Sequence, residues 1–272
     1  MFLDNIAGAI IGGVIAKQMY KEKVRLSFIV ALVAASNAGG AGSVIGDTTT
    51  TMMWIAGIPA ILFFKAFVAG VTAILFSGIV ASRDQHAYQP VVRTPGQNVH
   101  VDGARLFIVA VIVLGTIGAN IAFDFPAIGL WAGILIGSSM RQTPWAELRH
   151  ACRGALFLVL LVLSASFMPV NDLPPPSWQS ALGLGFVSAV FDNIPLTALA
   201  IYQGGYDWGV LAYTVGYGGS LIWFGSSAGV AISNLFPQAM NSVRWIKEGW
   251  HVAVAYMFGF FVMLFFTGWN PR

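Results

Sequence analysis

Long apolar stretches alternate with short polar ones along the chain, a pattern typical of membrane-spanning helices. Runs of this kind include Ile61–Ala81, Leu106–Phe123, Ala155–Phe167 with its flanks, and Val252–Thr267. A helix that crosses a bilayer needs about 20 mostly apolar residues. The pattern therefore predicts an all-α polytopic membrane protein.

Two of the apolar helices are predicted to end in glycine-rich breaks. The helix that begins at Leu26 runs into residues 36–47, and the helix over residues 209–215 runs into residues 216–229. Both stretches combine several glycines with polar residues, so we expect them to be non-helical. These are broken helices of the kind that transporters place at their binding sites.

Two further apolar segments are too short to span a bilayer. Residues 5–16 follow an Asp-Asn pair, and residues 196–202 follow a second Asp-Asn pair. The second pair closes a segment, residues 169–193, whose proline-rich start predicts a re-entrant hairpin. Both short segments are therefore predicted to be half-helices.

The breaks form an internal repeat, because the same motifs occur twice in the same order. Asp4-Asn5-Ile6 matches Asp192-Asn193-Ile194. The Gly39-Gly40 pair followed by Gly46 matches the Gly218-Gly219 pair followed by Gly225, and the spacing is the same in both. Paired breaks at corresponding positions indicate an inverted-repeat transporter with its site near the membrane midplane.

A polar linker, residues 83–104, separates the two repeats. Residues 1–82 are then a partial first repeat, and residues 105–272 are the second. If each glycine-rich stretch crosses the membrane once, every Lys and Arg except Lys65 and Arg272 falls on one side. The positive-inside rule makes that side cytoplasmic and the carboxyl terminus periplasmic. Lys65, near the outer end of its span, is interpreted as a snorkelling side chain.

Composition supports these predictions and excludes several classes of protein. Hydrophobic residues make up 57% of the 272 residues and charged residues only 9%, whereas soluble proteins carry about 25% charged residues. The single cysteine, Cys152, excludes an internal disulfide and a cysteine-based metal cluster. The sequence contains no histidine pair with metal-ligand spacing, phosphate-binding loop or nucleophile elbow. We therefore expect no enzyme activity, cofactor or nucleic-acid partner.

Asp47 is the strongest candidate for ion chemistry. It lies inside the first glycine-rich break and precedes four threonines, Thr48–Thr51. A carboxylate, hydroxyls and free backbone carbonyls are hard oxygen ligands, which suit a small hard cation. The alternative is that Asp47 and the threonines only cap the following helix.

Asp4 and Asp192 each stand where a half-helix begins. Either carboxylate can cap its helix, by accepting free backbone N–H groups and interacting favourably with the positive end of the helix dipole. A carboxylate within a membrane is costly, however, when it has no function. Neutral oxygen ligands are also available in both repeats, although interhelical hydrogen bonding explains each of them equally well. These neutral candidates are Asn37, Ser188, Asn193, Ser220, Ser226 and Ser227.

A carboxylate that holds either a proton or a cation explains exchange transport. Burial disfavours the charged form of a carboxyl group, so the cation must displace the proton. We expect Asp4 and Asp47 to have this role, with the loaded site exposed to each side in turn as the repeats move.

The sequence resembles the NhaD-type Na⁺/H⁺ antiporters of the ion transporter superfamily, which also contains citrate and arsenite permeases. The segments that carry the resemblance are Leu3–Asn5, Ser36–Gly40, Ile45–Trp54, Asp192–Leu196, Gly218–Ser220 and Gly225–Gly229. The resemblance implies that Na⁺ or Li⁺ is exchanged for protons across a bacterial inner membrane, with Na⁺ held at Asp4 and Asp47. It implies ion-handling roles at the positions Asp4, Asn5, Asn37, Asp47, Thr49, Thr50, Ser188 and Asn193.

We expect this chain to differ from the family at its amino end, by lacking the helices that precede the first Asp-Asn pair in family members. Three hypotheses remain: a cation/proton antiporter, an organic-anion or oxyanion permease of the same superfamily, and a non-transporting remnant or subunit. The expected partners are Na⁺ or Li⁺, protons and the lipid bilayer. A second copy of the chain, or a separate chain that supplies the missing helices, is a further expected partner.

Overall fold

The computed structural model describes residues 4–92, 102–143, 145–149 and 174–272, together with isolated residues between 152 and 167. Most of the predicted span Ala155–Phe167, and residues 168–173 of the predicted hairpin, lie outside the described residues. The chain divides into two compact units: Met1–Thr94 with Leu160–Arg272, and Pro95–Val159.

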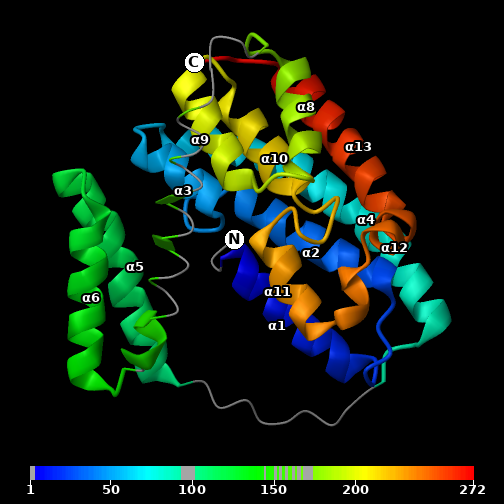
Figure 1. Ribbon diagram of the computed structural model, residues 1–272, viewed down its shortest axis with the longest axis horizontal. Coiled ribbons are helices and arrows are strands. Elements are labelled where there is room, and N and C mark those ends of the chain that lie inside the picture. Colours follow the sequence, from blue (N-terminus) through cyan, green and yellow to red (C-terminus); the bar gives the residue numbers. More distant parts are fainter. Residues whose placement is uncertain are drawn as a thin grey trace. The chain divides into compact units, whose positions relative to one another are not determined.

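Every regular element in the described part of the chain is a helix (Figure 1), which confirms the predicted all-α class. The larger unit contains α1 (Asn5–Met19), α2 (Leu26–Ala41), α3 (Thr48–Ile55), the 3-10 helix η1 (Ala60–Lys65), α4 (Ala66–Tyr88), α8 (Trp178–Ser188), α9 (Asn193–Gln203), α10 (Trp208–Gly218), α11 (Ser227–Leu235), η4 (Pro237–Met240), α12 (Ser242–Glu248) and α13 (Trp250–Thr267). The smaller unit contains α5 (Gly103–Phe123), α6 (Pro126–Met140) and η2 (Trp145–Glu147).

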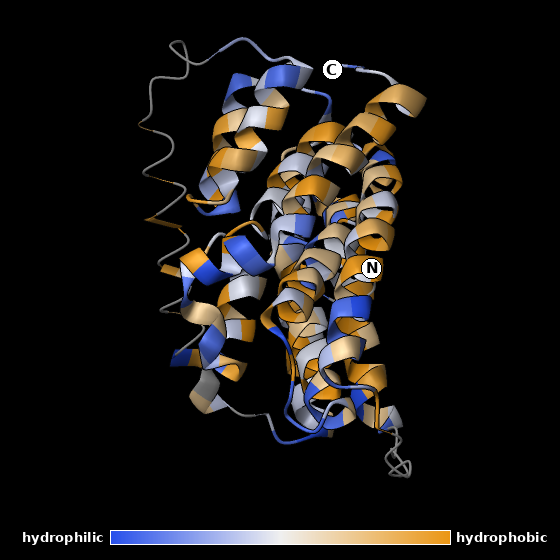
Figure 2. Cartoon of the chain, turned by 90° about the vertical axis from the view of Figure 1, so that its right-hand side faces the viewer, coloured by the Kyte–Doolittle hydropathy of each residue, from blue (hydrophilic) through white to orange (hydrophobic). Residues whose placement is uncertain are grey.

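Three helical segments of the described residues are long and apolar enough to cross a bilayer: Ala60–Tyr88, Gly103–Phe123 and Trp250–Thr267. Figure 2 shows that hydrophobic residues predominate along the long helices, whereas hydrophilic residues gather at many of the helix ends and connections. Large apolar side chains such as Leu75 and Phe265 are exposed on two of these helices. A lipid environment accounts for such an apolar surface.

Half-helices of one predicted repeat pack against helices of the other. Helix α1 lies beside α11, and α3 lies beside α9 (Figure 1). Helices α2 and α10, which lead into the two breaks, also contact each other, while the two spans α4 and α13 pack together. The broken segments of the two predicted repeats therefore enclose a common interior.

The glycine-rich stretches are more helical than the sequence predicted. Helix α2 continues through Gly39 and Gly40 to Ala41, and α10 continues to Gly218. Glycine weakens a helix by about 1 kcal/mol relative to alanine, but both segments are buried among other helices. Packing of this kind overrides the weak intrinsic preference, so the breaks are confined to residues 42–47 and 219–226.

Close backbone packing explains one of these glycines. A Cβ atom on Gly218 would clash with the carbonyl oxygen of Gly185, so α8 and α10 touch through their backbones. Gly218→Ala is expected to lower the free energy of unfolding by about 1–3 kcal/mol, because the two helices must move apart. Thermal unfolding in detergent measures the change.

The matched control for this change is Gly78→Ala in α4, where an added Cβ atom meets no atom within 4 Å. Alanine is the better helix former, so Gly78→Ala should unfold at or above the wild-type temperature. Equal unfolding temperatures for Gly218→Ala and the wild type would show that α8 and α10 do not pack this closely.

In the smaller unit, α5 and α6 form a helical pair whose polar ends are joined. Asp102 caps α5 by accepting a hydrogen bond of 3.1 Å from the backbone N–H of Arg105, and its other carboxylate oxygen accepts from Arg141. The Arg105 N–H and the Arg141 guanidinium hold the pKa of Asp102 below its usual value. Asp102 therefore stays ionised and links the start of α5 to the end of α6.

Candidate ion-binding site

Each of the two breaks ends at a residue whose side chain caps the next helix. After the first break, Asp47 caps α3: its Oδ1 accepts a 3.0 Å hydrogen bond from the N–H of Thr49. After the second, Ser226 caps α11: its Oγ accepts a 3.2 Å hydrogen bond from the N–H of Gly229. Asp47 and Ser226 therefore occupy corresponding positions at the ends of the two breaks, and only the predicted first repeat places a carboxylate there.

A network of amide and hydroxyl groups joins the two breaks through Asn37. Asn5 Nδ2 donates to Asn37 Oδ1 at 3.1 Å. Asn37 Nδ2 donates in turn to the hydroxyl oxygens of Ser220 and Ser226, each at 2.9 Å. All four side chains are buried. The structure thus brings together four of the predicted site residues, two from each predicted repeat.

Asp47 and Thr49 carry polar atoms without hydrogen bonds at the centre of this region. Both residues are buried, and neither Asp47 Oδ2 nor Thr49 Oγ1 makes a hydrogen bond to any described residue. Thr49 adjoins the carboxylate through its backbone, because its N–H donates to the other oxygen, Asp47 Oδ1, at 3.0 Å. A buried polar group left unpaired costs about 1–3 kcal/mol, and more when it is charged. Such an atom calls for an explanation, and a bound ion is one.

Two further carboxylates lie near Asp47. Asp4 stands at the start of α1, and Asp192 at the start of α9, where its Oδ1 accepts a 2.9 Å hydrogen bond from the N–H of Ile194. The charges of both residues act on the Asp47 carboxylate. The backbone N–H of Asn5 also donates to the carbonyl of Gly46 at 3.0 Å, which ties the start of α1 to the first break.

No three His, Cys, Asp or Glu side chains in the described residues are placed to hold a metal ion together. A cation at Asp47 would therefore need hydroxyl, amide or carbonyl oxygens among its ligands. These are the neutral hard ligands that suit a weakly bound alkali cation.

The remaining predicted residues lie around this centre with different hydrogen bonds. The Thr50 hydroxyl donates to the carbonyl of Ser43 at 2.7 Å, and the Ser188 hydroxyl donates to that of Val215 at 2.8 Å. Asn193 is buried at the first position of α9, and Ser227 is partly exposed at the first position of α11. Their roles as ion ligands stay predictions.

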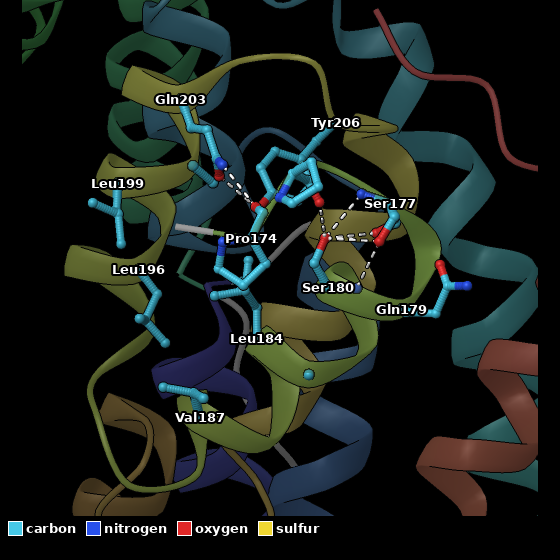
Figure 3. A pocket seen from close by; sticks show the side chains of 13 residues that line it. Pro174, Ser177, Gln179, Ser180, Leu184, Val187, Leu196, Leu199, Gln203 and Tyr206 are labelled. Carbon is cyan, nitrogen blue, oxygen red and sulfur yellow. Dashed lines mark hydrogen bonds between the residues drawn. The ribbon is translucent and has the colours of Figure 1, made fainter. Parts of the chain in front are cut away.

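A large cavity between α8 and α9 is unsuited to an ion. It has a volume of about 580 Å³, and apolar side chains such as Leu184, Val187 and Leu196 face it (Figure 3). Its polar groups lie at one end, where Gln203 donates to the carbonyl of Pro174 at 2.9 Å and accepts from Tyr206 at 2.8 Å. The apolar walls would not replace the water around a cation, so this cavity is not a candidate ion site.

Several curated transporters are similar to this chain. Sodium/proton antiporter 1 of Arabidopsis thaliana is 28% identical over 276 aligned residues, which cover 86% of this chain and 48% of that protein. The Na⁺/H⁺ antiporter NhaD of Vibrio cholerae is 26% identical over 292 aligned residues, which cover 84% of this chain and 60% of that protein. The Na⁺/H⁺ antiporter NhaD of Alkalimonas amylolytica is 28% identical over 263 aligned residues, which cover 75% of this chain and 53% of that protein. The chain is a relative of the NhaD-type sodium/proton antiporters. It is a multi-pass membrane protein.

The chain spans about half the length of the curated relatives it matches, from 48% to 60% of the three above. No family model matches the sequence. No solved structure matches it either.

The sequence did not predict the partner of Lys65. The Lys65 ammonium forms an ion pair with Asp207 Oδ2 and donates to the carbonyl of Gly268 at 2.5 Å. The same carboxylate oxygen accepts a 2.7 Å hydrogen bond from the backbone N–H of Asn270. Asp207 caps α10. Its place just before an apolar segment of the sequence is typical of a helix cap and does not indicate an ion pair. Lys65 is thus held by an internal ion pair.

Proposed function

We propose that this chain exchanges Na⁺ or Li⁺ for protons across a membrane, with Asp47 holding one or the other. The observation that carries the proposal is the buried Asp47 Oδ2, which makes no hydrogen bond to the described residues. The similarity to sodium/proton antiporters supports the choice of ions. We place the chain in a bacterial inner membrane, with its carboxyl terminus in the periplasm.

Competition for one carboxylate makes the exchange obligatory. With a proton on Oδ2 the Asp47 side chain is neutral, and with Na⁺ beside it the pair is also neutral. The fully ionised, unoccupied carboxylate is the costly state, because it is buried and the charges of Asp4 and Asp192 repel it. One ion therefore has to replace the other.

Access from the two sides would alternate by movement of the broken segments. Helices α1 and α11 form one packed pair, and α3 and α9 form another. The Asn37 network links residues of both predicted repeats, so such a movement would act on its hydrogen bonds. Repeats that rock around a fixed site are a common device in transporters of this architecture.

The acidic character of the site disfavours the anion permease. Asp4, Asp47 and Asp192 lie near the Asn37 network, and the other predicted site residues are neutral. An anion site would use free helix N–H groups with Lys or Arg close by. In this structure Lys65 is instead committed to Asp207.

Proteoliposomes containing the intact chain and a trapped pH indicator test the proposal. Addition of external Na⁺ or Li⁺, with the membrane potential clamped, should make the lumen more alkaline as protons leave. K⁺ should have a much smaller effect, and citrate should have none. A Na⁺ response equal to that of protein-free vesicles would overturn the proposal, and uptake of citrate or arsenite instead would favour the permease.

A further inference from the structure

Gly216 of α10 lies directly against the carboxylate oxygen of Asp47 that makes no hydrogen bond to the described residues. A Cβ atom built on Gly216 would stand 3.2 Å from Asp47 Oδ2 and 3.3 Å from the Cβ of Ala41. Both distances are shorter than ordinary van der Waals contacts by a few tenths of an ångström. The absence of a side chain at position 216 therefore leaves room beside this oxygen.

The position of α10 is fixed, so the helix cannot move away to make more room. Tyr213 and Tyr217 on α10 stack with Tyr256 of α13, with ring centroids 5.8 Å and 5.9 Å apart. The Tyr213 hydroxyl donates to the carbonyl of Tyr256 at 3.0 Å. All three tyrosines are fully buried. A close-packed interior of this kind resists small displacements.

We infer that Gly216 determines which alkali cation Asp47 accepts, by setting the space beside Oδ2. The inference rests on the proposed function, and it adds a residue that neither the Asp-Asn pairs nor the threonine run indicated. A methyl group at this position offers no ligand oxygen and occupies volume that a cation and its ligands need. A larger cation needs more of that volume, so the methyl group should penalise K⁺ and Na⁺ more than Li⁺.

The test is Gly216→Ala in the full chain, measured in proteoliposomes by the concentrations of Li⁺ and Na⁺ that give half-maximal lumen alkalinisation. The ratio of the Na⁺ value to the Li⁺ value should rise roughly tenfold, the lower end of what one methylene group is worth in a fitted pocket. Line broadening of the ²³Na and ⁷Li resonances gives the concentrations for half-maximal binding of the two ions. Their ratio reports selectivity in binding without transport.

Gly78→Ala is the matched control, because an added Cβ atom meets nothing within 4 Å there, and its ratio should equal that of the wild type. An unchanged ratio in Gly216→Ala, with a wild type that responds to Na⁺, would overturn the inference alone. A wild type with no Na⁺ response removes the proposed function and the inference with it.

Alanine favours the helix, so we expect Gly216→Ala to fold. If it does not, Ala41→Gly with Gly216→Ala removes the second close contact and keeps the methyl group beside Asp47. The double variant should show the same rise in the Na⁺ to Li⁺ ratio. A wild-type ratio in the double variant would also overturn the inference.

Discussion

Asp47→Asn is expected to abolish Na⁺-dependent proton movement, lowering the initial rate at least about a hundredfold, the scale on which essential groups act. The amide has no acidic proton to give up when the cation binds, and it brings no negative charge to offset the positive charge of Na⁺. The measurement is lumen alkalinisation in proteoliposomes after Na⁺ is added, with Li⁺ as the second ion.

Loss of structure is a poor explanation for that result, because asparagine caps helices as well as aspartate does. The hydrogen bond from the N–H of Thr49 to Asp47 Oδ1 can be kept by the amide oxygen, so the unfolding temperature should stay close to that of the wild type. Asp124→Asn is the matched control, since Asp124 is exposed at the end of α5 and adopts the left-handed conformation that asparagine tolerates. A rate in Asp47→Asn within a few-fold of the control would disprove the role of Asp47.

Lys65→Met is expected to have the largest effect on stability. It leaves the Asp207 carboxylate buried, with a side-chain exposure of only 5%, and without its ion-pair partner. Breaking a buried ion pair in this way costs about 3–5 kcal/mol. The midpoint of thermal or denaturant unfolding in detergent should fall accordingly.

A second substitution separates the charge from the packing. Lys65→Met with Asp207→Asn removes both charges and keeps a residue that caps α10, so it should recover most of the lost stability. Arg244→Met breaks the exposed pair with Glu248 and should cost less than about 1 kcal/mol. If the double variant is no more stable than Lys65→Met, the ion pair is not the reason for the loss.

The sequence predicted the three long apolar spans of the described residues, the positions of the two breaks, and four of the residues that meet near them. Those predictions depend on local patterns: hydrophobic runs, Asp-Asn pairs, and glycines at equal spacing. The hydrogen bonds from Asn37 to Ser220 and Ser226 join residues that are 183 and 189 positions apart. The equal order of motifs in the two repeats indicated that these residues would meet, but it did not give their partners.

The exact limits of the breaks and the partner of Lys65 could not be predicted in the same way. Gly39 and Gly40 stay helical because their segment is buried on contact with other helices, which no local propensity records. Lys65 and Asp207 are 142 residues apart and belong to no shared motif. The proposed role of Gly216 could not be predicted from the sequence either, because it depends on the distance from Gly216 to Asp47 in space and not on the residues beside Gly216 in the chain.

Helices from the first part of the chain pack against helices from the last part, and this has a consequence for the order in which the protein assembles. Helices α1 and α3 leave the ribosome before α11 and α9, their packing partners, have been synthesised. Until more than half of the chain has followed, Asp4, Asn37 and Asp47 have no second break to meet. Contacts of such long range form late, so membrane insertion of the amino-terminal helices must come before assembly of the site, which is completed only after α11 has been added.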